Sequence, residues 1–288
     1  MKKRSAFVAA VLALALAGSA SAQIILRAGD DPFSTPGGGT TTVDLAGYPI
    51  KQVFGAPVDG STVVGLKGES LGPQSALSGI DTIVRRPADI VVNGSTASGP
   101  LRLMALRLLS ESPVSIGGVP HTLRVFLSEF RTGIVVGTLA VTFTNGDGGT
   151  FSSSFSVRPK LVFTDPSGRN TVIDCGAITC GSGSDLALTV SGAPFTRSGG
   201  PGGFSPSSQG IRLLPAGVPV DADGNGTADF TTLASTNFFV GVTPVRPFPI
   251  ANVIKQEGGG RHGFFPPIFS ATATVAPFPS TAVPTSGN

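Results

Sequence analysis

The sequence predicts an all-β fold, with an antiparallel β-sandwich-like core and a second β region rich in proline and phenylalanine. Only 13% of the 288 residues are charged, whereas 40 are glycine and 24 are proline. This balance is typical of many short strands joined by tight turns, and it disfavours helices. Several stretches also alternate apolar and polar residues between turn dipeptides, which indicates strands with one buried face.

The first 22 residues have the three parts of a secretory signal peptide. Three basic residues open the chain, an apolar run covers residues 7–17, and Ala20-Ser21-Ala22 is a small-x-small cleavage site. We therefore expect residues 1–22 to be removed and the remaining 266 (288 − 22) to be secreted, held at the cell surface or periplasmic. No later stretch has about eighteen apolar residues in a row, so no integral membrane segment is expected after signal removal.

Removal of the signal changes the charge balance. The signal contains three of the 20 Lys and Arg residues and none of the 17 Asp and Glu residues, so 17 of each remain and the formal net charge is zero. The longest basic run left is Arg85-Arg86. Binding to a phosphate backbone needs a basic patch or stripe, and we therefore expect no nucleic-acid partner.

Residues 23–47 are expected to form an extended N-terminal arm, followed by a β-sandwich-like domain at residues 48–191. Within this domain, residues 101–109 follow no clean period, and the prolines at 100 and 113 favour a strand there. The clearest signal is a hairpin, in which residues 134–144 and 151–157 alternate on either side of a glycine-rich turn. Further strands are expected at 48–54, 61–67, 80–84, 89–92, 121–127, 160–164, 171–174 and 186–190.

The composition changes after this domain. Residues 192–210 are rich in Gly, Pro and Ser and are expected to form a loop or linker. From Pro194 onward lie 10 of the 18 phenylalanines outside the signal and 13 of the 24 prolines. We expect a second β region at residues 211–276, which carries a calcium-type hairpin, and a flexible tail at residues 277–288.

Cys175 and Cys180 are the only cysteines. In an exported protein such a close pair predicts a local disulfide. A zinc site needs four ligands, and this pair with His121 or His262 does not readily provide them.

Residues 221–230 have the spacing of a calcium loop. Side-chain oxygens fall at positions one, three, five and nine, a glycine that permits a sharp bend falls at six, and the backbone carbonyl of Thr227 falls at seven. Calcium takes six to eight oxygen ligands, so the loop predicts a structural calcium site. A helix-loop-helix site needs glutamate at position twelve, where this chain has Thr232. The expected side-chain ligands are Asp221, Asp223, Asn225 and Asp229.

This pattern resembles the nine-residue calcium loops of integrin-type FG-GAP propeller repeats. The resemblance covers residues 221–230 alone and occurs once, so it implies a calcium loop joining two strands and does not imply a propeller. A polar hairpin turn that binds nothing remains the alternative, because Asp-Gly and Asn-Gly are common turn dipeptides.

Motifs for catalysis are weak. Gly68-Glu69-Ser70-Leu71-Gly72 matches the G-x-S-x-G nucleophile elbow, but the helix that must follow is disfavoured by Pro73. Glu111 and Glu129 could form an acid pair for glycoside hydrolysis only if they met across strands. No catalytic role is assigned to these residues or to either histidine, of which His121 is expected at the surface or as a cap.

The function expected from the sequence is that of an exported, non-catalytic surface, matrix or adhesion protein, stabilised by a disulfide and calcium. Its partners would be cell-surface or matrix glycans or proteins. Two alternatives remain open: a secreted hydrolase of polysaccharide or ester substrates, and a calcium-dependent glycan-binding module. The chain has no Trp and one Tyr, which weakens sugar binding on aromatic platforms but leaves calcium-bridged binding open.

Overall fold

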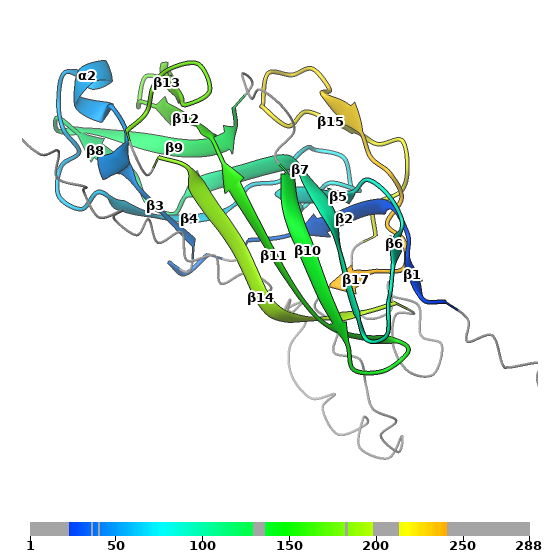
Figure 1. Ribbon diagram of the computed structural model, residues 1–288. Helices are drawn as coiled ribbons and strands as arrows, with labels where there is room; N and C mark the ends of the chain where they lie inside the picture. The colour runs from blue at the N-terminus through cyan, green and yellow to red at the C-terminus, as the bar shows by residue number, and fades with distance from the viewer. Residues whose placement is uncertain are drawn as a thin grey trace, which may run out of the picture.

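The computed structural model describes residues 23–35, 37–39, 41–128, 136–181, 184–197 and 213–240 (Figure 1). It confirms the all-β, antiparallel class. The strands are β1 (Ile25–Leu26), β2 (Gly29–Phe33), β3 (Thr41–Asp44), β4 (Val63–Gly68), β5 (Thr82–Arg86), β6 (Ile90–Val91), β7 (Thr96–Ser110), β8 (Val114–Ile116), β9 (Val119–Leu127), β10 (Val136–Phe143), β11 (Gly148–Val157), β12 (Pro159–Thr164), β13 (Asn170–Asp174), β14 (Leu186–Thr196), β15 (Pro219–Val220), β16 (Phe230–Thr231) and β17 (Phe239–Val240).

Strand β7 is the central strand of the sheet and pairs with four others. Along one edge its first half pairs with β10 and its last residues pair with β9. Along the other edge it pairs with β5 and then with β4. The ambiguous stretch at residues 101–109 is therefore a strand, as the flanking prolines predicted. It is the one strand that runs unbroken through both halves of the described sheet.

The neighbouring strands repeat this division. In one half of the sheet β9 pairs with β12, and β12 pairs with β13. In the other half β10 pairs with β11, and β11 pairs with β14. On the other side of β7, β4 pairs with β3 and β5 pairs with β2. The described residues thus form an antiparallel meander that is bent across its middle (Figure 1). Register shifts occur at Ile83/Val84 and at Phe151/Ser153, and bulges of this kind increase the local twist.

The main core lies on one face of this bent sheet. Residues of β10 alternate between buried and exposed along the whole strand. Val141 lies opposite Phe151 in register, and both are almost fully buried. This pairing confirms the β10–β11 hairpin and the buried face that alternation predicted. Residue 135, which was expected on the same face, lies outside the described residues.

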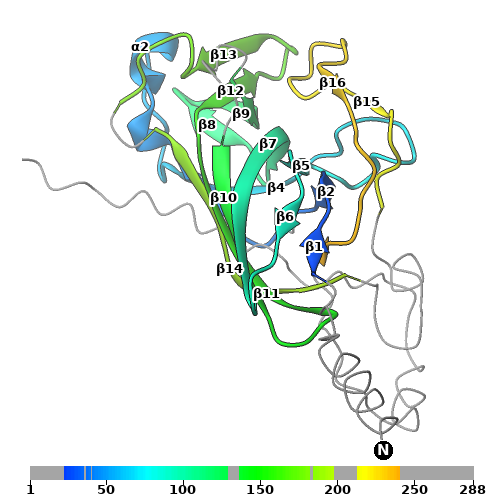
Figure 2. The same ribbon diagram turned by 45° about the vertical axis from the view of Figure 1, so that its right-hand side comes forward.

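A second, smaller core lies on the opposite face, over β5 and β7. Ile83 and Ala105 from these strands are packed under Leu71, Leu214 and Val220. These last three come from the loop after β4 and from residues 213–230. Figure 2 shows the β15–β16 hairpin beside β5 and β7. The described part of the second β region is therefore packed onto the first, and β17 joins the edge of β14.

Three sequence-based expectations are wrong. The extended N-terminal arm expected at residues 23–47 contains β2 and β3, which pair within the main sheet. Residues 48–54 are not a strand: a 3-10 turn (η1, Leu45–Gly47) capped by Asp44 leads to a short helix (α2, Ile50–Phe54). Gly55 ends that helix with a φ of 73°, a left-handed cap that glycine adopts freely.

The expected linker at residues 192–210 also begins too early, because β14 continues to Thr196. Strand β14 stays paired with β11 over these residues, with Pro194 opposite Thr150 and Phe195 opposite Gly149. Residues 1–22, where a signal peptide is expected, and residues 241–288 lie outside the described residues. No helix in the described segments is long and apolar enough to cross a membrane.

Candidate metal centre

Strands β15 and β16 place the predicted calcium loop. They pair antiparallel, with Val220 opposite Phe230, so residues 221–229 form the connection of a hairpin. Val220 and Ala222 are buried in the second core. Because side chains alternate along a strand, Asp221, directly after Val220, lies on the side away from that core.

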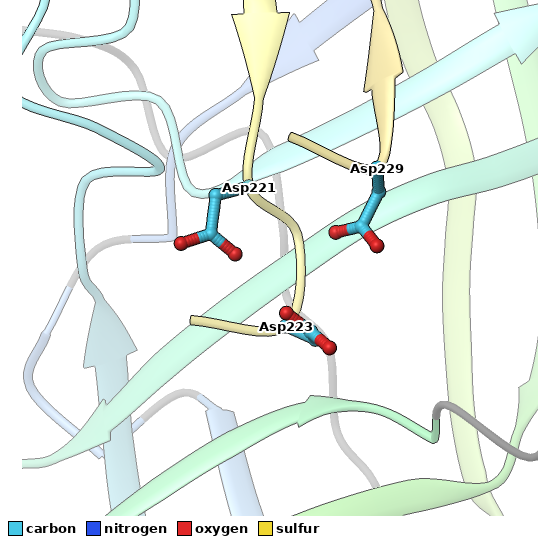
Figure 3. A group of neighbouring side chains, drawn as sticks. All are labelled: Asp221, Asp223 and Asp229. Atoms are coloured by element: carbon cyan, nitrogen blue, oxygen red, sulfur yellow. The ribbon is translucent and has the colours of Figure 1, made fainter. Parts of the chain in front are cut away.

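The structure brings three of the predicted ligands together. Asp221, Asp223 and Asp229 each offer a carboxylate oxygen, and these oxygens lie within 4.8 Å of one another. Figure 3 shows Asp221 and Asp229 where the two strands end, with Asp223 between them. Two oxygens bound to one Ca²⁺ at 2.3–2.6 Å can be at most about 5 Å apart. The three carboxylates are therefore close enough to share one metal ion.

Backbone N–H groups hold this arrangement. Asp221 Oδ1 accepts hydrogen bonds from the backbone N of Gly224 (2.8 Å) and Asn225 (3.1 Å), and its Oδ2 accepts one from Gly226 (2.8 Å). Both glycines have positive φ, 77° and 89°. Asp229 Oδ2 accepts a hydrogen bond from Ala222 N at 2.7 Å, which ties the two sides of the loop together. The turn is thus built around the carboxylates.

The carboxylates influence one another electrostatically. Partial burial raises the pKa of Asp221, but the N–H groups of Gly226 and Gly224 outweigh it and hold that pKa below its ordinary value. Burial raises the pKa of Asp223, and the adjacent Asp229 and Asp221 raise it further. At 4 Å two like charges repel by about 1 kcal/mol in water and about 4 kcal/mol near a protein surface. A divalent cation would relieve that repulsion.

Two predicted ligands have other contacts. Asn225 Nδ2 donates to Asp223 Oδ2 at 2.9 Å, so the amide braces a carboxylate. Its Oδ1 accepts a hydrogen bond from the Thr227 backbone N at 2.7 Å. The use of Asn225 Oδ1 and the Thr227 carbonyl as calcium ligands stays a prediction.

An open polar groove lies beside the hairpin, and the sequence did not predict it. Its volume is about 420 Å³, and Asp223, Gly224 and Asn225 form one wall. The floor is the outward face of β7, β9, β12 and β13. The pairing of Lys160 with Phe126 places alternate residues of two of these strands on one face. Alternation could have predicted that face, but the loop that covers its edge comes from far along the chain.

The predicted disulfide between Cys175 and Cys180 is confirmed. It closes the loop between β13 and β14, where the sheet bends. Beyond it, Gly181 N donates to Gly47 O at 3.1 Å and Tyr48 Oη donates to Ser184 O at 2.7 Å. The disulfide loop is therefore fastened to the η1 turn.

The catalytic candidates in the described residues have structural roles. Ser70 Oγ accepts a hydrogen bond from Gly79 N at 2.7 Å within a loop of turns, so no helix follows it as an elbow requires. The Glu111 carboxylate accepts hydrogen bonds from the backbone N of Gly38 and Gly39. His121, expected at the surface, is buried and lies edge-on to Phe54, with ring centroids 5.2 Å apart. Glu129 and His262 lie outside the described residues.

Comparison of the chain with protein-family models, with curated proteins and with solved structures gives no match. The site is therefore interpreted from its own geometry.

Proposed function

We propose that this chain is an exported, non-catalytic surface or matrix protein whose β15–β16 hairpin is held by calcium. One observation carries the proposal: Asp221, Asp223 and Asp229 converge at the end of a hairpin that is anchored in the second core. The residue types support calcium in particular, because carboxylates are hard oxygen ligands suited to a hard cation.

Calcium would act here as a clip. The described hairpin strands are only two residues each, and a two-stranded hairpin has little stability of its own. Val220 supplies apolar anchoring at one end, whereas the other end consists of carboxylates that repel one another. A bound cation would join Asp221, Asp223 and Asp229 and would hold the hairpin against the sheet.

A surface or matrix role is favoured over hydrolysis by the hydrogen bonds of the catalytic candidates. Glu111 and Ser70 already hold backbone N–H groups in place, which is a structural use of both side chains. The local disulfide adds a covalent constraint on a surface loop. Both features suit a protein that must keep its shape outside the cell.

Fractionation of the producing cells, with and without EDTA, tests the proposal. We expect the protein in the surface fraction and its release by chelation. The Asp223→Asn variant should be released without EDTA. Asp165→Asn is the matched control, because Asp165 accepts N–H groups of another exposed turn and lies outside the carboxylate cluster. Free secretion of all three proteins regardless of calcium would contradict surface attachment.

A further inference from the structure

The groove beside the hairpin has the size and lining of a ligand site. Its volume of about 420 Å³ lies within the range of about 300–1,000 Å³ that is usual for small-molecule sites. One wall is the tip of the hairpin and the floor is a sheet face. Strand backbones there are already paired between β7, β9, β12 and β13. A ligand that lies over β9 and β12, which are paired on both sides, must therefore be recognised by side chains; β13 pairs with β12 alone.

Positive charge predominates among the lining residues. Arg107, Arg124 and Lys160 face two acids, Glu69 and Asp223, and Asp223 belongs to the carboxylate cluster. The chain beyond the signal has a formal net charge of zero, so this excess is local. Such a lining favours an anionic ligand.

Arg124 is held ready for such a ligand. Its Nε lies 3.0 Å from both oxygens of Glu69. Within the described part of the chain, its two terminal nitrogens donate to no protein acceptor. Arg107 lies on the other side of Glu69, 3.6 Å from it, and its buried Nε has no hydrogen-bond partner among the described residues. A planar guanidinium with free N–H groups binds carboxylate or sulfate oxygens in pairs.

Neutral polar groups and the apolar side chains of Phe126, Val162 and Val172 complete the lining. Thr164 and Asn170 lie opposite each other in register, and Thr164 Oγ1 donates to Asn170 Oδ1 at 2.8 Å. The amides of Asn170 and Asn225 carry both donors and acceptors, as sugar hydroxyls require. An acidic peptide would more commonly pair with a free strand edge, here the outer edge of β13, than lie over β9 and β12, where both edges are already paired. The lining therefore favours a saccharide over a peptide.

We propose that this groove binds an acidic saccharide chain, with Arg124 contacting a carboxylate or sulfate group and Asn170 contacting hydroxyls. This inference deepens the proposed function and rests on it, because the calcium-held hairpin forms one wall. Removal of calcium would free that wall and weaken saccharide binding. The same lining accounts for adhesion to a glycan matrix without an aromatic platform.

Isothermal titration calorimetry tests the inference. The full mature chain, saturated with calcium, is titrated at low salt with an oligogalacturonate tetramer, a sulfated tetrasaccharide, a neutral tetrasaccharide and a short polyglutamate. We expect saturable binding of one or both acidic saccharides, weakened by added salt, and no binding of the neutral saccharide or of polyglutamate. The preferred acidic saccharide distinguishes a carboxylate from a sulfate ligand.

Variants locate the site. Arg124→Gln should weaken acidic saccharide binding about tenfold or more, which is the effect expected for loss of a charged hydrogen-bonding partner. Asn170→Ala should weaken it less. Arg158→Gln is the control, because Arg158 is an exposed arginine paired with Asp185 outside the groove, and it should bind like the unmodified chain. Circular dichroism and thermal melting confirm that each variant is folded.

Three results would overturn the inference: no binding of either acidic saccharide, equal losses in Arg124→Gln and Arg158→Gln, or equally tight binding of polyglutamate. A calcium-dependent melting temperature without saccharide binding would reject the groove and leave the calcium hairpin intact. Saccharide binding that is the same in calcium and in EDTA would reject the coupling between the two.

Discussion

Replacement of Arg86 with methionine is expected to destabilise the protein strongly. Arg86 is fully buried and forms an ion pair with Asp31 on the neighbouring strand β2. Its Nε donates to Arg27 O at 2.9 Å and its Nη2 donates to Thr236 Oγ1 at 2.8 Å. The guanidinium also lies 4.8 Å from the ring centroid of Phe238. One side chain thus fastens residues 236–238 to the N-terminal strands.

The magnitude follows from the partner that remains. Removal of one member of a buried ion pair typically costs about 3–5 kcal/mol, because the other charge stays buried without compensation. Burial already raises the pKa of Asp31 to about 6, against the lowering effect of Arg86. Without Arg86 that pKa should rise further. A carboxyl whose folded-state pKa is raised loses stability as pH increases from its ordinary pKa, so the deficit of the variant should be larger at pH 7 than at pH 5.

Urea unfolding measures this effect, and Tyr48 is a convenient reporter because it is the only tyrosine in a chain without tryptophan. The double variant Asp31→Leu/Arg86→Met serves as the control. Since it buries no isolated charge, it should recover about half of the lost stability or more. A loss below about 1 kcal/mol in Arg86→Met, or an equal loss in both variants, would refute the account of a charge pair that clamps this segment.

Three further outcomes are expected. Replacement of Cys175 and Cys180 with alanine should lower the free energy of unfolding by about 2 kcal/mol, because the closed loop is short; an unchanged urea midpoint would contradict this. Burial raises the pKa of Asp81 to about 6, so its carboxyl should cost about 2 kcal/mol of stability as pH rises from 4 to 7. Asp81→Asn should lack that loss in urea titrations at the two pH values, and parallel pH profiles would count against it. Gly224→Ala should weaken calcium binding in calorimetry, because φ is 77° and the new Cβ would lie 2.9 Å from Arg107 Nη2. Gly146→Ala, where the added Cβ meets nothing within 4 Å, should bind calcium as the unmodified chain does.

Much of the fold could be predicted from local pattern. The alternation around Val141 and Phe151 predicted a hairpin with one buried face, and the structure has it in that register. The strand expected at residues 48–54 from their apolar content is wrong, because a capped turn precedes them. Asp44 accepts a hydrogen bond from Ala46 N and starts the η1 turn, which diverts the chain from the strand expected at residues 48–54.

Long-range pairing was beyond the sequence patterns. Asp30 lies opposite Arg85 on β5 and pairs with it, whereas Asp31 lies opposite Val84 and pairs diagonally with Arg86. Each pair satisfies charges on one face of the strand, and neither could be assigned before the β2–β5 register was known. This register also explains why residues 29–33 belong to the main sheet.

The candidate metal centre was more predictable because its ligands are close in sequence. Spacing alone identified Asp221, Asp223 and Asp229, and the hairpin brings their oxygens together. The adjoining groove was not predictable, because Glu69, Arg107 and Arg124 come from three strands or loops that meet only in the folded sheet.

The melting temperature in calcium and in EDTA tests the central claim, calcium binding by the hairpin, most directly. At a free calcium concentration one hundred times the Kd, a bound ion adds about 2.7 kcal/mol, which corresponds to about 5–11 °C for a chain of this size. We expect that increase in the unmodified chain and in Asp165→Asn, and its loss in Asp221→Asn and Asp223→Asn. Identical melting of the unmodified chain in calcium and in EDTA would contradict the claim.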